Sequence, residues 1–147
     1  MTSDPLAFEF FNEIGIIDQL IGTMLTNALP TGMTKAQFTV LNHFVRLGLT
    51  EKSPADLASA FQVRRPTITS TLARMENAGL VSIRADPRDA RGKLVSLTPA
   101  GRDMRERCIT ALGSIAPALE PIIADAEMQA VLPTLRKLRV GLDKLRD

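Results

Sequence analysis

The side chains of this chain that could do chemistry are mostly basic, and they are concentrated in its middle third. Residues 53–107 carry 10 basic and 6 acidic side chains, whereas residues 1–52 carry 3 and 5, and residues 108–147 carry 5 and 5. A concentrated positive excess attracts polyanions, so this region is where a nucleic-acid partner is expected. A solvated charged surface is the alternative that charge alone leaves open.

One predicted helix in this region, at about 65–78, has two unlike faces. Ile68, Leu72 and Met75 recur at the helical period and are expected to pack inward. Small hydroxyl and arginine side chains point broadly the other way, and such a face can enter the DNA major groove and reach base edges. An ordinary surface helix is the alternative. The candidate DNA-binding residues of this helix are Arg64, Arg65, Thr67, Thr69, Ser70 and Arg74.

A predicted hairpin follows this helix, because the sequence alternates in residues 80–84 and again in 93–97. The polar stretch 86–92 between them is too long for a two-residue turn, and we expect it to form a loop. Within it, Asp86 and Asp89 are expected to orient neighbouring arginine side chains. Arginines on such a tip can enter the narrow minor groove. A mobile, solvated hairpin is the alternative. The candidate DNA-binding residues of the hairpin are Arg88, Arg91 and Lys93.

Capping signals divide the segment before the hairpin into short helices. Thr34 and Gln37 form a capping box ahead of a helix that Gly48 ends, with Phe38, Leu41, Phe44 and Val45 expected on its buried face. Ser53 caps a third helix, and a turn of three or four residues separates it from the helix at 65–78. Two short helices with a tight turn, followed by a basic hairpin, predict a winged helix-turn-helix, mainly α with a small β-hairpin.

Longer helices are expected on both sides of this unit. The first runs over 4–29 with Asp4 as its cap, and it is apolar nearly all round, so it needs burial on more than one side. A fifth helix opens at Thr98 and is broken by Pro117 and Pro121. The last begins near Asp125, has a proline that kinks its start, and carries apolar residues at the 4-3 spacing of a coiled-coil seam: Val131, Leu135, Leu138, Leu142 and Leu145.

Other function classes find little support in the residue types. The only histidine, His43, is interpreted as structural, since a metal site needs several ligands, and no catalytic grouping can be built around it. Cys108, the only cysteine, is interpreted as inert, and most methionines as core residues. No cofactor, metal site or catalytic residue is expected, and neither is a membrane span or a signal peptide. The expected location is the cytoplasm.

The sequence resembles the MarR family of transcriptional regulators between about Thr34 and Gly101. The resemblance is strongest in the hairpin, where Asp86-x-Arg88-x-x-Arg91 is followed by Leu97-Thr98-x-x-Gly101. The chain departs from the family at two positions: Arg64 stands where a serine is common, and Ala90 where an arginine is common. The other matching residues are Thr34, Gln37, Ser53, Leu57, Ala58, Pro66, Thr67, Ile68, Thr69, Leu72, Met75, Glu76, Gly79, Leu80, Val81 and Val95.

The resemblance implies a homodimer whose first and last helices interdigitate, with each winged helix on one half of a palindromic operator in double-stranded DNA. It divides the chain into an N-terminal dimerisation helix (1–32), a DNA-binding domain (33–98, with the wing at about 80–97) and C-terminal dimerisation helices (99–147). It also implies a small apolar or aromatic acid effector, bound between the dimerisation helices and residues 34–60 in a pocket lined by Leu, Ile, Met and Phe.

The function expected from these residues is that of a sequence-specific DNA-binding transcriptional regulator, most often a repressor that a small ligand releases. The alternative from another class is a winged-helix protein-interaction module with only non-specific affinity for DNA. An enzymatic function has the least support, because the sequence contains no catalytic grouping of residues.

Overall fold

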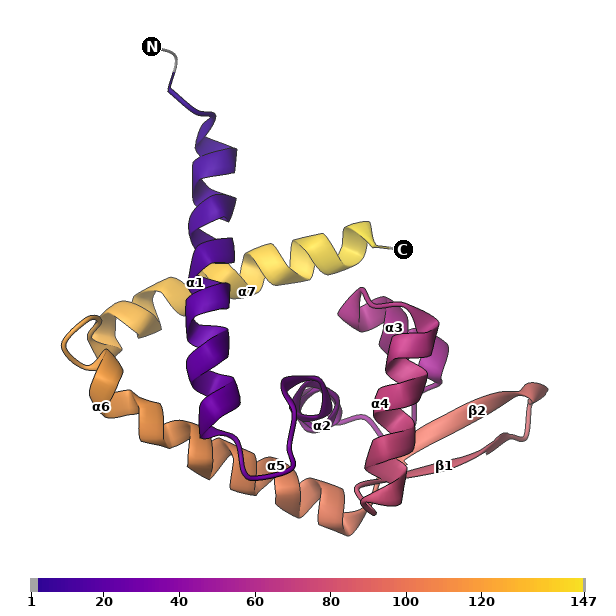
Figure 1. Cartoon of the computed structure of the whole chain (residues 1–147). Coiled ribbons are helices and arrows are strands. Elements are labelled where there is room, and N and C mark those ends of the chain that lie inside the picture. The colour runs from indigo at the N-terminus through magenta and orange to yellow at the C-terminus, as the bar shows by residue number, and fades with distance from the viewer. Residues whose placement is uncertain (1–2, 147) are drawn as a thin grey trace.

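The computed structural model describes residues 3–146, and it is mainly helical with one antiparallel hairpin, as the sequence predicts. The chain begins with one long helix, continues through the three short helices and the hairpin, and returns through four more helical segments (Figure 1). The elements are α1 (Leu6–Ala28), α2 (Lys35–Leu47), α3 (Pro54–Phe61), α4 (Arg65–Asn77), β1 (Val81–Asp86), β2 (Asp89–Leu97), α5 (Pro99–Leu112), η1 (Gly113–Ile115), α6 (Ala116–Leu119) and α7 (Asp125–Leu145).

Side-chain caps begin three of the helices, at the residues that the sequence indicates. Thr34 and Gln37 form a reciprocal capping box at α2, and Ser53 Oγ accepts the backbone N–H of Asp56 at α3. Thr98 Oγ1 accepts from the backbone N–H of Gly101 at α5. Each cap satisfies an N–H group that the helix itself leaves free. The predicted cap of α1 is wrong: its N-cap is Pro5, with no side-chain hydrogen bond.

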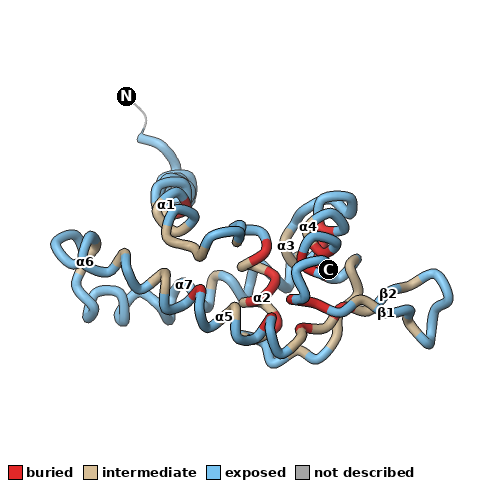
Figure 2. The backbone as a smooth tube through the Cα atoms, turned by 60° about the horizontal axis from the view of Figure 1, so that its bottom comes forward, coloured by how far each residue is buried: buried red, intermediate tan, exposed pale blue. Residues whose placement is uncertain are grey.

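The core lies where α2, α3, α4 and the base of the hairpin meet, and Figure 2 shows the buried residues concentrated there. Leu41 and Phe44 of α2 are fully buried as expected, whereas Phe38 and Val45 are half-buried and Val40 takes a core position instead. Ile68, Leu72 and Met75 of α4 fill the same core. The inward face predicted for the helix after the turn is therefore confirmed.

The hairpin is tighter than its sequence suggests. Asp86 pairs with Asp89, so only Pro87 and Arg88 form the turn, and the expectation of a longer loop is wrong. Two effects account for this. Asp86 Oδ1 accepts the Arg88 backbone N–H at 2.9 Å, which closes the turn, and a register shift after Ala85 absorbs the surplus residues of β2 as a bulge.

The helical segments after the hairpin also differ in part from expectation. α5 ends at Leu112, before Gly113 and earlier than the prolines predicted to break it. Pro117 lies in the first turn of α6, where a missing N–H removes no helical hydrogen bond. α7 begins at Asp125 as predicted and runs to Leu145 with Pro133 inside it.

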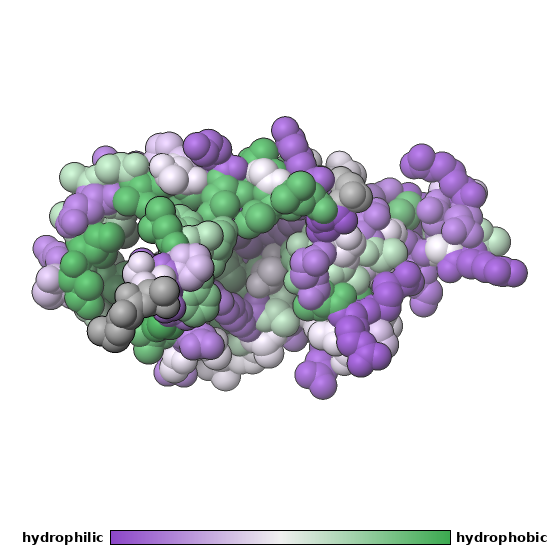
Figure 3. All heavy atoms as spheres, turned by 90° about the horizontal axis from the view of Figure 1, so that it is seen from above, coloured by the Kyte–Doolittle hydropathy of each residue, from purple (hydrophilic) through white to green (hydrophobic). Residues whose placement is uncertain are grey.

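The outer helices leave many large apolar side chains in contact with solvent. α1 stands away from the core and passes across α7, and α5 forms the opposite edge of the molecule (Figure 1). Seen from above, hydrophobic residues gather over α1 and α7, and hydrophilic ones over the hairpin (Figure 3). Met128, which we expected in a core, is 37% exposed on α7. No helix within residues 3–146 is both long and apolar enough to cross a bilayer.

A close backbone contact joins the start of α5 to the start of the hairpin. The backbone oxygen of Leu80 accepts the Thr98 N–H at 3.1 Å, and Thr98 Oγ1 donates to the backbone oxygen of Gly79 at 2.6 Å. Gly101 is buried at this point, and a Cβ atom there would lie 2.1 Å from the Leu80 oxygen. Only glycine therefore allows α5 to approach the hairpin so closely.

We predict that Gly101→Ala destabilises the protein by about 1–3 kcal/mol, because the added methyl group forces α5 away from Leu80. Gly113→Ala is the matched control: its backbone is helical and a Cβ there meets nothing within 4 Å. The control is expected to leave stability unchanged or to raise it by up to about 1 kcal/mol. Urea unfolding followed by circular dichroism measures both variants. Equal midpoints for the two would contradict this account of the contact.

Candidate nucleic-acid interface

The turn between α3 and α4 fixes the direction of α4. Gln62 ends α3 in the left-handed conformation, with φ of 54°, and is the only non-glycine residue within 3–146 with a positive φ. Its side-chain amide donates to the backbone oxygen of Ser59 at 2.7 Å, and the Val63 N–H donates to that of Ala58 at 3.0 Å. These bonds turn the chain within the three residues between the end of α3 at Phe61 and the start of α4 at Arg65.

All the candidate residues of α4 are exposed. Burial of Ile68, Leu72 and Met75 on one side of the helix turns the opposite side to solvent. Thr67, Ser70 and Arg74 follow each other at intervals of three and four, which is one helical face. In the part of the chain that the structure describes, none of the basic residues of this set forms an ion pair. The exposed set is Arg64, Arg65, Thr67, Thr69, Ser70 and Arg74.

The amino end of α4 carries positive charge without a cap. Its N-cap is Arg64, no side chain accepts from the first turn, and no acidic residue lies there. Free N–H groups and the helix dipole make such an end attractive to phosphate. The sequence has Arg64 where the family often has a serine cap, and the structure confirms that α4 begins without a side-chain cap.

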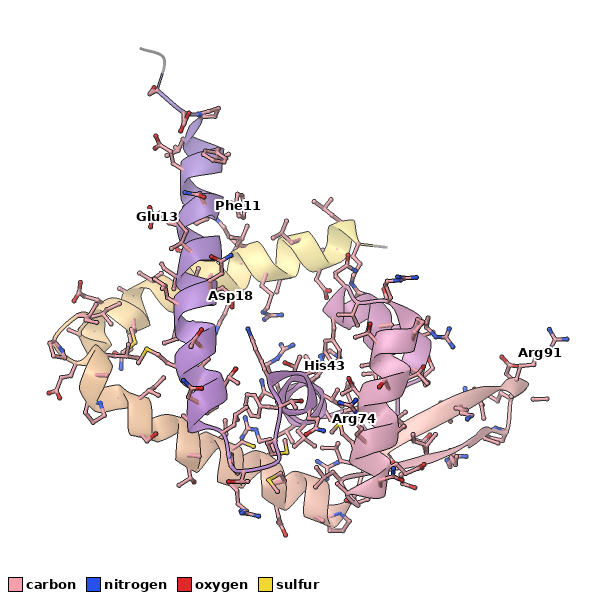
Figure 4. The ribbon with its side chains drawn as sticks, viewed as in Figure 1. Phe11, Glu13, Asp18, His43, Arg74 and Arg91 are labelled. Atoms are coloured by element: carbon pink, nitrogen blue, oxygen red, sulfur yellow. The ribbon has the colours of Figure 1, made fainter. Side chains whose placement is uncertain are left out.

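The three candidate residues of the hairpin are exposed as well. Arg91 lies at the tip, at the far end of the hairpin from α4 (Figure 4). Asp89 Oδ1 accepts the backbone N–H of Arg91 at 3.0 Å, just as Asp86 does for Arg88. The two carboxylates therefore hold the backbone of the tip, and the expectation that they orient arginine side chains is wrong. The guanidinium groups of both arginines, like the ammonium group of Lys93, make no ion pair with a described residue.

Contacts that the sequence did not suggest hold the hairpin against the helices. Glu76 Oε2, near the end of α4, accepts the backbone N–H of Ile83 in β1 at 3.1 Å. Arg84 donates two hydrogen bonds to Glu51 Oε1, at 2.7 and 3.0 Å. Lys52 exchanges backbone hydrogen bonds with Val95 in β2. Glu76 and Val95 are among the residues that match the family, but contacts between distant residues follow no local sequence pattern, and these were therefore not predicted.

A cleft separates α2 and α3 from the end of α7. It has a volume of about 520 Å³. Its wall contains charged residues from all three helices and so differs from the apolar lining expected for an effector pocket, whereas a second hollow between α1, α3 and α7 has a mostly apolar wall. His43 lies on its wall with its ring edge-to-face against Phe61, at a centroid distance of 4.9 Å (Figure 4). Burial lowers the pKa of His43 below its ordinary value, and the charges of Arg46 and Lys52 lower it further.

Cys108 has the environment of an unreactive thiol. It is fully buried on α5, and burial raises its pKa above the ordinary value, against a smaller opposite effect of Arg107. A raised pKa keeps the sulfur protonated, and the thiolate is the reactive form. The structural role that the sequence suggests fits this position.

The known proteins to which this chain is similar are regulators of transcription. The pattern of the MarR family matches residues 31–92, which include α2–α4 and most of the hairpin. The transcriptional activatory protein BadR of Rhodopseudomonas palustris is 32% identical over 116 residues, which are 78% of this chain. The chain spans 65% of the length of BadR.

Solved structures of similar proteins cover almost the whole chain. Wild-type MarR from E. coli, without ligand, is 26% identical with a TM-score of 0.76, over 94% of this chain and 98% of that one. A mutant of the same protein in complex with operator DNA has a TM-score of 0.70 at 26% identity, over 92% of this chain and 99% of that one. These matches show that the chain is similar to proteins of the MarR family, whose members are transcription regulators and not enzymes.

Proposed function

We propose that the chain is a homodimeric, sequence-specific DNA-binding regulator, and a repressor that a small ligand releases from its operator. The observation that carries this proposal is the pair of exposed basic surfaces on α4 and on the hairpin, whose candidate basic side chains form no ion pair with a described residue. A MarR mutant has been solved with operator DNA, which supports the same use of this fold.

The two surfaces suit different parts of a duplex. The outward face of α4 (Thr67, Thr69, Ser70 and Arg74) enters the major groove, where hydroxyl and guanidinium groups meet base edges. Arg64 and Arg65 at its amino end bind phosphates, which position the helix without selecting a sequence. Arg88, Arg91 and Lys93 bring positive charge to the adjacent minor groove and backbone.

Terminal helices α1 and α7 are the proposed dimer interface. Phe8, Phe11 and Leu20 of α1 are 46–68% exposed, and Leu135 and Leu142 of α7 are 40% and 50% exposed. A second hollow, of about 620 Å³, lies between α1, α3 and α7 and has a mostly apolar wall. So much apolar surface is unusual on a monomer and is typical of an interface. In this proposal residues 1–32 and 99–147 pair two copies, and residues 33–98 bind DNA.

A small organic effector completes the proposed mechanism. Bordetella bronchiseptica BpsR, whose DNA binding is regulated by 6-hydroxynicotinic acid, has a structure that matches this chain with a TM-score of 0.71 at 26% identity, over 88% of this chain and 98% of that one. BadR is named as an activatory protein. A reporter fused to the chain's own upstream region distinguishes the two directions: deletion raises expression under a repressor and lowers it under an activator.

Binding to labelled DNA from that upstream region tests the core of the proposal. We expect a specific complex whose affinity falls steeply with salt, because bound phosphates release counterions. A protein-interaction module would give only weak binding that is indifferent to sequence, and that result would refute the proposal.

Substitutions on the two surfaces are predicted to act differently. Arg91→Ala weakens binding to all sequences and lowers the salt dependence by about one counterion. Arg74→Ala and Thr67→Ala weaken binding and, in addition, reduce the preference for the operator sequence. For Arg74→Ala the loss of discrimination is about 1–3 kcal/mol at the base pair that the arginine contacts. Arg136→Ala, on the exposed side of α7, is the control for lost charge. Fluorescence anisotropy with operator and scrambled duplexes measures all four. An unchanged preference in Arg74→Ala would show that another face of α4 meets the bases.

Glu76 is predicted to act through the position of the hairpin. Glu76→Ala removes the acceptor for the Ile83 N–H and is expected to weaken operator binding about threefold to tenfold, the range of one hydrogen bond. Glu76→Gln retains an acceptor oxygen and is expected to bind nearly as well as the unaltered protein. In an Arg91→Ala background the loss from Glu76→Ala should largely disappear, since coupled residues are not additive. Full additivity in this double-mutant cycle would contradict a positioning role.

The dimer interface is tested on α7. Leu135→Glu places a charge in the proposed apolar contact and is expected to convert the dimer to a monomer in light scattering coupled to gel filtration. Operator affinity should then fall more than about 100-fold, because the two half-sites are no longer bound together. Lys137→Glu, two residues along the same helix, should remain dimeric. A Leu135→Glu protein that stays dimeric would place the interface elsewhere.

A further inference from the structure

The proposed DNA-binding unit, residues 33–98, is attached to α5 through buried contacts. Gly101 lies against the backbone of Leu80, and Met104 packs against the core of the unit. Arg105 of α5 donates from Nη2 to Asn42 Oδ1 of α2 at 3.1 Å. All of these contacts are with one helix, which passes α2 at the edge of the molecule (Figure 1). A body held along one edge can still turn about that edge, so its orientation depends on what holds it elsewhere.

The other side of the unit, at α3, faces the end of α7 across two hollows. The charged cleft of about 520 Å³ and the apolar hollow of about 620 Å³ both lie here, and Arg146 lies on the wall of both. Packed side chains therefore do not fill the space between the two helices. Within residues 3–146, a single side-chain hydrogen bond and no ion pair join α7 to the unit: Arg146 Nη1 donates to Ser59 Oγ at 2.6 Å.

The guanidinium group of Arg146 is held in place by its own helix. Its Nε and Nη2 atoms donate to Asp143 Oδ1, three residues earlier on α7, at 3.1 and 3.0 Å. These two bonds fix the plane of the group and leave Nη1 directed at Ser59. The Arg146 side chain is only 23% exposed, so water competes little for the bond. A hydrogen bond with a charged donor is also stronger than one between neutral groups.

Ser59 is at the same time part of the turn that directs α4. Its backbone oxygen accepts the Gln62 N–H at 3.1 Å and the Gln62 side-chain amide at 2.7 Å. Gln62 is the left-handed residue of this turn, and α4 begins three residues later. The end of α7 is therefore bonded to a residue on which the α3–α4 turn is built. A shift of α7 relative to α3 is passed to α4 through this one residue.

We propose that Arg146 is a positioning residue for DNA recognition: its bond to Ser59 sets the angle of α4 relative to the terminal helices, and with it the half-site spacing that the dimer accepts. This inference rests on the proposed function, because it concerns two copies of α4 on one operator. One added base pair turns one half-site relative to the other by about 35°. A dimer with both α4 helices held at a fixed angle tolerates that change poorly, whereas a dimer whose DNA-binding units turn freely tolerates it better.

Fluorescence anisotropy with operators of altered spacing tests this proposal. The duplexes carry the protein's own operator and two versions with one base pair added or removed between the half-sites. Arg146→Ala and Ser59→Ala are each expected to lower the preference for the natural spacing at least about threefold, since each removes the same hydrogen bond. A general loss of structure would weaken binding to all three duplexes alike and leave the ratio of affinities unchanged.

Further variants separate the bond from the charge. Lys144→Ala removes a charge from the last turn of α7 and should keep the spacing preference, as should Ser59→Thr, which retains a hydroxyl group. Arg146→Lys keeps the charge but lacks the planar fork that reaches Asp143 and Ser59 together, so it should behave like Arg146→Ala. The double variant Arg146→Ala/Ser59→Ala should lose no more preference than either single variant, because the two residues act through one bond.

Hydrogen exchange of the DNA-free protein provides a measurement that does not depend on DNA binding. Arg146→Ala is expected to speed exchange in residues 59–65 about threefold or more and to leave α2 and α5 unchanged. Unchanged exchange in residues 59–65, or an unchanged spacing preference in both single variants, would overturn the proposal. Faster exchange in a protein that forms no specific DNA complex would refute the proposed function and leave the Arg146–Ser59 contact standing, so the two failures are distinguishable. Melting curves check that the variants are folded.

Discussion

Burial of one narrow face of α4 is the constraint on which the rest of the structure depends. Ile68, Leu72 and Met75 are almost completely buried against α2, α3 and the base of the hairpin. Because a helix is rigid, burial of these three side chains in the core also determines which side chains of α4 face the solvent. The hydroxyl and arginine side chains of the opposite face are exposed for this reason, and the same core anchors the strands that carry the hairpin tip. The buried face of α4 therefore determines which face of the same helix is available for the proposed recognition of DNA.

Local sequence signals predicted most of this arrangement. The caps at Thr34, Ser53 and Thr98 lie where hydroxyl side chains precede an apolar rhythm, and such bonds form within four residues, so no tertiary information is needed. The inward face of α4 followed from its period. The predictions are wrong where the structure depends on contacts between residues that are far apart in the sequence. The bulge that shortens the turn after Asp86 depends on pairing across the hairpin, and the charged cleft depends on bringing α7 against α2, which no local pattern encodes.

The uneven charge of the sequence now has a structural explanation. Many of its basic residues lie in one of three environments: the exposed surfaces of α4 and the hairpin, the pair in which Arg84 donates two hydrogen bonds to one oxygen of Glu51, and the wall of the cleft. Sequence counting treats these groups alike, although Arg84 braces the base of the hairpin. The hydrophobic residues are likewise of two kinds: some form the core inside one chain, and others form the exposed apolar faces of α1 and α7, which suit a second copy.

Hydroxyl-radical footprinting of the protein on DNA from its own upstream region tests the central proposal most directly, because it maps where α4 and the hairpin meet the duplex. Two copies of this winged helix are expected to protect two symmetric patches whose centres lie about 10 base pairs, or a multiple of that, apart on one face of the DNA. Protection that is absent, or that spreads evenly without regard to sequence, would contradict it.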